Sequence, residues 1–497
     1  MSIKRNVIAN YASQIYITLI AIVMVPTYLS YMGTEAYGLV GFFSMLQGWL
    51  QLMDLGLSAT LSREVASYRA GGLTEDRINI LLRVLVTVFV GAGLLFATIV
   101  CLSSSWISNT WLHANKLPTH LVAQCISLMG AAAAARWIAS PYRGVIGGWE
   151  KQAWLGVYNI AVNTVRYVLV LAVFVLIGVD PRAFFAYQLL VAVVELVILW
   201  WKSGEFLQGA RAWPSLALEP LLAMWRFSGS LAFCSIVWIF ITQTDKLVLS
   251  KTLTLIDYGY FAVAMMVANG VSLLASPISG ALLPRLTYLA TQQDAVGLQS
   301  LYRNATQMVS VVIWPVACTV AFFAEPLLLV WTKNAVVAQH AAPVLFWYAL
   351  GNACLGVAAF QFYMQFAHGK LRLHVIGNAV FVVVLIPGVL WASIKYGAVG
   401  AGRMWFAENL MFFLVWTWIV HQRFAPGLHW KWFGRDVLPI ALSALCVSGI
   451  LSYYVPLSPQ RLLVFGQLIL FGSIALISAA MSSSTVRGKA ALWLNNK

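Results

Sequence analysis

Apolar stretches of about twenty residues recur along the whole chain, separated by short polar segments. A helix needs about 20 residues to cross roughly 30 Å of hydrocarbon, so each stretch predicts one transmembrane helix. The predicted spans are 8–32, 37–61, 81–103, 120–140, 157–178, 184–202, 226–250, 257–280, 305–330, 343–367, 373–395, 399–421, 436–455 and 462–481. The pattern therefore predicts an all-α membrane protein with about 14 transmembrane helices and no soluble domain.

Polar residues interrupt several spans at helical spacing, which places them on one face of each helix. Any single Ser, Asn or Gln is explained by hydrogen bonding between neighbouring membrane helices. Several such stripes together favour a shared, water-accessible substrate cavity, whereas 81–103, 305–330 and 462–481 are predicted to be plainly apolar. The residues predicted to line the cavity are Asn10, Gln14, Gln47, Gln51, Asp54, Asn163, Arg166, Lys246, Asn269, Gln361 and Gln365.

Charged residues at membrane depth are stronger signals, because each costs about 2.5–3.5 kcal/mol or more at the bilayer centre. Arg166 is expected to face the cavity and meet an anion or an acid, since a guanidinium does not deprotonate. Lys246 could instead snorkel to the interface, and Glu195 could be a buried acid in a structural hydrogen bond. Adjacent helical residues do not share a face, so Asp245 and Lys246 are expected to have different partners. The candidates for ion coupling are Asp54, Glu408, Asp245 and Glu195.

Landmarks from the first half of the sequence recur in the second half. Tyr37-Gly38 returns as Tyr258-Gly259, and Gly148 returns as Gly369 at the same offset in the numbering. A duplication of this kind predicts two pseudo-symmetric six-helix lobes of the same orientation, related by an axis along the membrane normal. The predicted units are an N-terminal six-helix lobe at 1–225, a C-terminal six-helix lobe at 226–435, and two extra transmembrane helices with a cytoplasmic tail at 436–497.

The composition agrees with a lipid environment. Hydrophobic residues make up 61% of the 497 residues and charged residues 9%, whereas a soluble domain has about 25% charged residues. With the N-terminus in the cytoplasm, cytoplasmic segments hold 22 of the 31 Lys and Arg residues and outer segments hold seven. This asymmetry is the positive-inside rule, and it predicts that both termini are cytoplasmic. It also accounts for most of the net charge of +15, so this charge does not require nucleic acid as a partner.

The sequence lacks motifs that are typical of soluble enzymes. It has no phosphate-binding glycine loop, no HExxH and no nucleophile elbow. The six cysteines stand singly within or at the edges of spans, which indicates small apolar packing residues. We therefore expect no metal, no cofactor and no enzymatic activity, and any function must lie between the helices.

Four stretches carry a family resemblance. They are Tyr37-Gly38 with Asp54-Leu-Gly56-Leu and Arg63-Glu64; Gly147-Gly148-Trp-Glu150-Lys151 before Asn159; Thr244-Asp245-Lys246-Leu-Val-Leu-Ser250 with Gly259-Tyr260; and Ala281-Leu-Leu-Pro284-Arg285-Leu with Leu301-Tyr302. By their order and spacing, over roughly 1–425, the chain resembles the Wzx-type polysaccharide and O-antigen flippases. These belong to the multidrug/oligosaccharidyl-lipid/polysaccharide exporter superfamily.

The resemblance implies a multi-pass protein of the bacterial inner membrane. It implies alternating-access export of undecaprenyl-diphosphate-linked sugar repeat units for O-antigen, capsule or exopolysaccharide assembly, with proton coupling as an option. Its expected partners are the lipid-linked glycan, membrane lipids, and the polymerase and chain-length proteins of the pathway. Arg166 or Lys246 would meet the diphosphate. The family's cavity is often cationic, but intramembrane acids outnumber bases here, which is a departure from that pattern.

Three other functions stay open at this point. A proton- or cation-coupled antiporter of small molecules or drugs in the same superfamily would predict resistance to cationic compounds and intact surface glycan on deletion. A polymerase or ligase usually needs a large outer loop, and the predicted outer loops are all short. A non-transporting scaffold would have no use for the charged residues inside the spans.

Overall fold

The computed structural model describes residues 3–50, 54, 56–207, 236–274 and 276–488, without the side chains of 3–11, 276–281 and 283–284. Within these ranges the chain is almost entirely helical and forms no strand beyond one isolated bridge between His113 and Thr254. Eleven helical segments there are long and apolar enough to cross a membrane. The all-α membrane fold is therefore confirmed. The count of fourteen spans and the cytoplasmic termini stay predictions.

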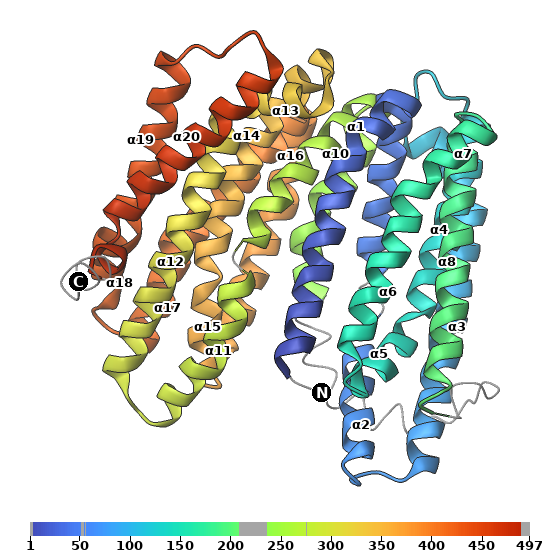
Figure 1. Cartoon of the computed structure of the whole chain (residues 1–497), viewed down its shortest axis with the longest axis horizontal. Coiled ribbons are helices and arrows are strands. Elements are labelled where there is room, and N and C mark those ends of the chain that lie inside the picture. The colour runs from blue at the N-terminus through green and yellow to red at the C-terminus, as the bar shows by residue number, and fades with distance from the viewer. Residues whose placement is uncertain (1–2, 51–53, 55, 208–235, 275, 489–497) are drawn as a thin grey trace. The chain divides into compact units, whose positions relative to one another are not determined.

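The chain divides into two compact units, Met1–Gly259 and Tyr260–Lys497 (Figure 1). The first unit holds a helical segment at 236–252 and α1 (Ile3–Leu50), α2 (Leu57–Arg69), α3 (Glu75–Trp106), α4 (Thr119–Ile138), α5 (Ser140–Gly148), α6 (Gln152–Thr164), α7 (Val170–Leu176) and α8 (Pro181–Ser203). Most of α10 (Leu255–Leu273) belongs to the second unit. That unit continues with α11 (Ser276–Thr291), α12 (Ala295–Phe322), α13 (Ala324–Thr332), α14 (Ala335–Ala358), α15 (Phe360–Ala367), α16 (Arg372–Met411), α17 (Thr417–Phe424), α18 (Leu428–Lys431), α19 (Leu438–Tyr454) and α20 (Arg461–Ser482).

Two of the longest helices contain a kink at a glycine. The backbone has φ 77° at Gly33 in α1 and φ 61° at Gly397 in α16. A residue in this region cannot continue a right-handed helix, and glycine adopts it without a steric penalty. Each kink separates two predicted spans, so α1 carries the first span and the first part of the second, and α16 carries the eleventh span and most of the twelfth. The division into these two units does not test the predicted lobe boundaries at 225/226 and 435/436, which stay predictions.

The second predicted span is interrupted before its end, so its prediction as one continuous helix over 37–61 is wrong. α1 ends at Leu50, and α2 starts after Gly56, which has φ 74°. Oδ1 of Asp54 accepts hydrogen bonds from the backbone N of Ser58 at 3.1 Å and from its hydroxyl at 2.8 Å. The helix restarts here because Gly56 takes the left-handed conformation and Asp54 satisfies a free amide in the first turn of α2.

The helix starts and breaks repeat along the chain. α4 gives way to α5 at Ala139, and α14 gives way to α15 at Ala359. α3 starts at Glu75 and α12 at Ala295, which is the same offset in the numbering. The recurrence of helix starts and breaks at one offset, close to that of the Tyr-Gly pairs, supports the pseudo-symmetric lobes predicted from the sequence.

The two C-terminal helices, α19 and α20, are packed into the second unit and lie beside α12 (Figure 1). Val311, Ile440 and Ala479 bring the three helices together in one apolar cluster. At the other end, the ring of Phe471 lies 5.1 Å from that of Phe323. Because these contacts are apolar and run along the helix pair, α19 and α20 are an integral part of this unit.

Candidate functional site

A cluster of charged side chains lies inside the first unit. Arg143 and Arg166 each donate a hydrogen bond to one carboxylate oxygen of Glu195. Arg136 donates to Oε1 of Gln188 at 3.0 Å, and Nε2 of Gln188 contacts the backbone carbonyl of Arg166 at 3.4 Å. We call Arg136, Arg143, Arg166 and Glu195 the arginine cluster. It sets three guanidinium groups against one carboxylate, which leaves two positive charges that its own acid does not balance.

Local breaks in helical geometry position the arginine cluster. Arg136 lies in the last turn of α4 and Arg143 in α5, on either side of the break at Ala139. Arg166 lies in a single π-helical turn, Val165–Leu169, that interrupts the helix between α6 and α7. A π-turn carries more residues per turn than an α-helix, so it re-aims the side chains around it, and such turns are frequent at functional sites.

Amide side chains complete the surroundings of the cluster. Oδ1 of Asn159 accepts a hydrogen bond from Arg143 at 2.7 Å, and Oδ1 of Asn163 accepts one from Arg166 at 2.9 Å. Tyr158 donates to the backbone carbonyl of Glu195 at 3.1 Å and packs in an apolar cluster with Tyr142 and Leu199. These contacts fix the guanidinium groups in place, as a preorganised polar site requires.

Burial makes the cluster expensive without a ligand. Glu195 is 4% exposed and Arg166 is 9% exposed. The Nε atoms of Arg136 and Arg166 are buried and have no hydrogen-bond acceptor among the described residues. Buried charged donors without acceptors are unfavourable, and guanidinium groups bind phosphate-type anions with fork geometry. The excess positive charge and the buried donors make the cluster a candidate binding site for an anion.

The sequence predicted only part of this cluster. Arg166 does meet an acid, one of the two kinds of partner expected for it, and Asn163 lies beside it. Its function in transport stays a prediction. Arg136 and Arg143 are among the 22 Lys and Arg residues that the positive-inside count places in cytoplasmic segments. Two signals pointed to them: Arg136 falls inside the predicted span 120–140, and Arg143 follows two helical turns later on the same face.

Glu408 is a buried acid in the second unit. It is 3% exposed, and neither of its carboxylate oxygens has a hydrogen-bond partner in the described part of the chain. At the offset that relates the two helix breaks, Glu408 corresponds to Gln188, and Gly356 corresponds to Arg136. The second repeat thus has an acid where the first has an amide, and glycine where the first has the matching arginine. The glycine at 356 offers no guanidinium to Glu408, which agrees with the absence of a partner for this acid among the described residues.

Two other cavity candidates lie on α15. Gln361 is 3% exposed and Gln365 is completely buried. Nε2 of Gln365 contacts the backbone carbonyl of Gln361 at 3.4 Å, and the side-chain oxygens of both have no donor in the described ranges. Buried amide oxygens without donors can accept hydrogen bonds from a hydroxyl-bearing ligand or from water.

Asp245 and Lys246 share a contact, contrary to the expectation that they need different partners. Nζ of Lys246 donates to the carbonyl of Thr242 on the preceding turn and lies 3.6 Å from Oδ1 of Asp245. The expectation failed because the long lysine side chain turns back along its own helix, so its ammonium group reaches its neighbour. Asp245 is 2% exposed and also accepts a hydrogen bond from the backbone N of Lys246.

The remaining cavity candidates differ in their exposure. Gln14 and Asn269 are exposed, and Gln47 is half-buried. Gln51 lies outside the described residues, and the side chain of Asn10 lies outside the described side chains. A cavity shared by all the polar stripes stays a prediction.

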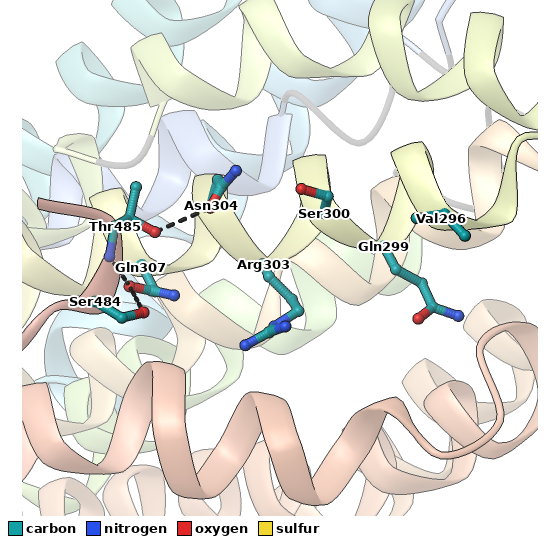
Figure 2. Close-up of a pocket in the computed structure, with 8 residues that line it drawn as sticks. All are labelled: Val296, Gln299, Ser300, Arg303, Asn304, Gln307, Ser484 and Thr485. Atoms are coloured by element: carbon teal, nitrogen blue, oxygen red, sulfur yellow. Dashed lines mark hydrogen bonds between the residues drawn. The ribbon is translucent and has the colours of Figure 1, made fainter. Parts of the chain in front are cut away.

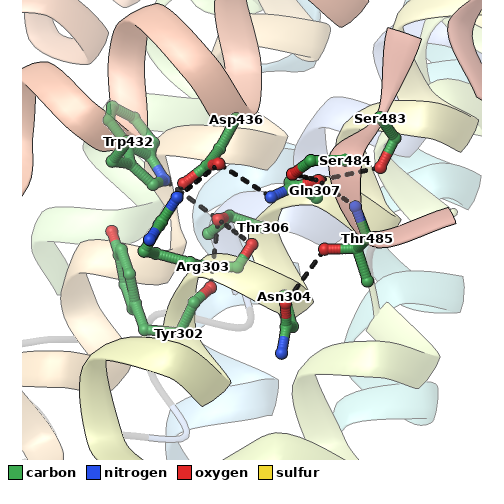
Figure 3. Close-up of polar contacts among 10 residues, drawn as sticks. All are labelled: Tyr302, Arg303, Asn304, Thr306, Gln307, Trp432, Asp436, Ser483, Ser484 and Thr485. Atoms are coloured by element: carbon green, nitrogen blue, oxygen red, sulfur yellow. Dashed lines mark hydrogen bonds and ion pairs between the residues drawn. The ribbon is translucent and has the colours of Figure 1, made fainter. Parts of the chain in front are cut away.

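A second polar network, which the sequence did not suggest, lies near the start of α12 (Figure 3). Nη2 of Arg303 donates to Oδ1 of Asp436 at 2.9 Å, and Nε2 of Gln307 donates to the same oxygen at 2.8 Å. Oε1 of Gln307 accepts hydrogen bonds from the hydroxyl of Ser483 at 2.8 Å and the backbone N of Thr485 at 3.0 Å. The prediction that 305–330 is plainly apolar is wrong at Gln307. This amide is 2% exposed and tolerated because protein groups satisfy both of its ends.

A pocket of about 420 Å³ opens beside this network (Figure 2). Its wall includes Gln299, Ser300 and Asn304 from one side of α12. Arg303, the cation in that wall, is already paired with Asp436. The pocket therefore offers mainly neutral hydrogen-bonding groups, and the arginine cluster is the stronger candidate for an anionic substrate.

The chain matches a known protein family. The sequence model of a family described as polysaccharide biosynthesis protein matches residues 3–290. Among curated protein sequences none matches the chain.

The fold has solved counterparts. A structure of the lipid II flippase MurJ in an inward closed conformation superposes with a TM-score of 0.74 at 14% identity, covering 96% of this chain and 97% of that one. An inward-facing multidrug resistance MATE family transporter of the MOP superfamily gives 0.63 at 13% identity, with 81% and 94% covered. A Vibrio cholerae MATE transporter gives 0.57 at 13% identity, with 84% and 96% covered. The chain thus has the fold shared by these flippases and transporters.

Proposed function

Because the chain belongs to the polysaccharide biosynthesis protein family, we propose that it is a flippase for undecaprenyl-diphosphate-linked oligosaccharide repeat units. It moves them from the cytoplasmic to the outer leaflet of the bacterial inner membrane by alternating access. The product serves O-antigen, capsule or exopolysaccharide assembly, with the polymerase and chain-length proteins of that pathway as partners. The transporter fold supports transport and gives no support to an enzyme.

The observation that carries this proposal is the arginine cluster. A diphosphate link brings negative charge and acceptor oxygens into the membrane, and guanidinium groups bind such oxygens in pairs. The cluster has two positive charges in excess and buried Nε donors without acceptors among the described residues. The neighbouring amides Asn159 and Asn163 hold the guanidinium groups of Arg143 and Arg166 in place for such a ligand.

The energetics favour outward movement of such a substrate. Each unpaired polar group of the sugar would cost several kcal/mol in hydrocarbon, so the headgroup needs a polar path while the lipid tail stays in the bilayer. An inside-negative potential drives an anion outward by about 2.3 kcal/mol per charge per 100 mV. The membrane potential therefore contributes to export without any coupling ion.

A proton-coupled cycle would add a titrating carboxylate to this scheme. The candidates are Asp54 and Glu408, with Asp245 and Glu195 behind them. The buried carboxyl of Glu408, unpartnered within the described ranges, supports it as the first choice. The hydrogen bonds from Ser58 to Asp54 and the two ion pairs of Glu195 favour structural parts for those residues.

The experiment that tests the flippase is a deletion strain. We expect one lipid-linked glycan to accumulate on the cytoplasmic face, and the parental gene to restore its export. Complementation with Arg136→Gln, Arg143→Gln or Arg166→Gln should restore less export than the parental gene at equal expression. Unchanged surface polysaccharide in the deletion strain would refute the proposal.

A small-molecule or drug antiporter is the second candidate, because MATE transporters share the fold and a buried intramembrane acid such as Glu408 suits cation coupling. This alternative predicts that deletion sensitises the cell to cationic compounds and leaves surface glycan intact. The same deletion strain therefore separates the two functions.

A further inference from the structure

Two glycines at the predicted outer ends of the second and eighth spans make the same close contact in opposite directions. A methyl group on Gly38 would lie 2.2 Å from the carbonyl oxygen of Leu255, and one on Gly259 would lie 2.3 Å from the carbonyl oxygen of Thr34. The offset from Thr34 to Leu255 in the numbering equals the offset from Gly38 to Gly259. Gly38 therefore packs on Leu255, while its repeat equivalent Gly259 packs on Thr34, the repeat equivalent of Leu255. Such a reciprocal pair of contacts is the arrangement of a two-fold contact.

The segment 111–116 fastens to one side of this crossing. The indole of Trp111 donates to the hydroxyl of Ser250 at 3.0 Å, and its ring lies beneath Nζ of Lys251 at 4.8 Å. The backbone N of Leu255 donates to the carbonyl of His113 at 2.9 Å. These contacts hold the turn that leads into α10.

The same segment also fastens to the other side. Oε1 of Glu35 accepts hydrogen bonds from the backbone N of Asn115 at 2.6 Å and from that of Lys116 at 3.0 Å. Glu35 is 6% exposed and lies next to the kink at Gly33 in α1. The repeat equivalent of Glu35, at the offset of the two glycines, is Ile256, which cannot accept such bonds. The two-fold crossing is thus fastened by a segment that only the first repeat anchors in this way.

We propose that these parts form an outer clasp, defined as Thr34–Gly38, Leu255–Gly259 and the segment 111–116. It holds the predicted first, second and eighth spans together at their outer ends, within the unit Met1–Gly259, and it opens when substrate is released outward. The proposal rests on the alternating-access transport proposed above. Helices that meet through glycine and backbone carbonyls can part and rejoin without repacking side chains, which suits a contact broken in every cycle.

A labelling experiment tests the clasp without reference to any substrate. Ala36 is 2% exposed beside Glu35, so Ala36→Cys, in a chain whose native cysteines are replaced, should react slowly with a membrane-impermeant maleimide added outside. Adding Gly38→Ala, Gly259→Ala or Glu35→Gln should raise the labelling rate several-fold. The matched control is Gly270→Ala in α10, where an added methyl group meets nothing within 4 Å and labelling should stay at the starting rate.

A second measurement decides the matter if the glycine variants do not fold. His113 and Thr254 pair across a parallel β-bridge, so their Cα atoms lie about 5 Å apart, within reach of a disulfide. Oxidising the double variant His113→Cys/Thr254→Cys should stop export in the complemented deletion strain, and a reductant should restore it. Parental labelling rates in folded glycine variants, or full export by the oxidised double variant, would overturn the clasp. Either result leaves the flippase proposal standing if the deletion strain accumulates lipid-linked glycan.

Discussion

Arg166 donates a hydrogen bond to Glu195 inside the first unit, between a π-helical turn and α8. Arg143 binds the other oxygen of the same carboxylate. The cluster contains no second acid to replace Glu195, so this one side chain holds together an assembly of like charges.

Glu195→Gln should destabilise the protein by about 3–5 kcal/mol, because removing one partner of a buried ion pair leaves the others uncompensated. Thermal unfolding of the detergent-solubilised protein, followed by tryptophan fluorescence, measures the loss. The control is Glu150→Gln, whose carboxylate is 75% exposed and lies 3.6 Å from Arg69. An exposed pair contributes little, so the control should unfold at the parental temperature. Equal unfolding temperatures for both variants would show that the cluster does not depend on its acid.

Glu408→Gln should preserve folding, because Glu408 has no hydrogen-bond partner that the amide would lose in the described part of the chain. If this acid carries the coupling proton, the variant should lose the dependence of export on an imposed pH gradient. Export in inverted membrane vesicles with and without the gradient measures this.

Two variants control the coupling test. Glu325→Gln changes an exposed acid in α13 and should leave the gradient dependence unchanged. Asp54→Asn tests the other candidate. Intact pH dependence in both Asp54→Asn and Glu408→Gln would eliminate these two candidates.

Gln307→Leu should release the C-terminal segment from the second unit. The amide oxygen of Gln307 holds Ser483 and Thr485, and its nitrogen binds Asp436. Leucine makes none of these bonds and leaves buried groups unsatisfied, so trypsin should cut faster after Arg487. The control is Gln299→Leu, which changes a residue in the wall of the neighbouring pocket. Identical proteolysis of both variants would argue against the network.

Asp180→Ala should destabilise α8 by about 0.5–2 kcal/mol, since its side chain accepts a hydrogen bond from the backbone N of Arg182 at 2.8 Å and caps the helix. Asp180→Asn keeps the cap and is the control. The hydrogen bond from the Arg182 side chain holds the pKa of Asp180 below its ordinary value. The contribution of the ionised form is therefore present at neutral pH and falls as the pH drops through that lowered pKa. Parental unfolding temperatures for Asp180→Ala would contradict the cap.

The membrane fold was predictable because lipid imposes a length and a composition on each helix. The kinks at Gly33 and Gly397 were harder to predict, since glycine is common in membrane helices and only its backbone angles distinguish a kink. The interruption at Gly56 was missed for the same reason. The Tyr-Gly pairs stand out in the sequence because their glycines make backbone contacts that a side chain would block, and the duplication they indicate stays a prediction.

The candidate site was less predictable, because charge counting cannot separate a cytoplasmic arginine from a buried one near a helix end. Arg136 and Arg143 follow the positive-inside rule, and yet both bind side chains of α8 in the interior. Gln307 was missed because a single amide in an apolar stretch is a weak signal. Its partners come from segments far away in the sequence. Pairing between such distant segments is visible only in the folded structure.

The crossing of Gly38 and Gly259 has a consequence for the history of the chain. In a two-fold interface one surface binds its own copy, so a half-length protein carrying a single such glycine could form this crossing by dimerising. Any substitution there would have altered both sides at once. Fusion of the two copies lets the sides change independently. Under the predicted duplication, the acid at position 35 and the isoleucine at the equivalent position 256 are one such change.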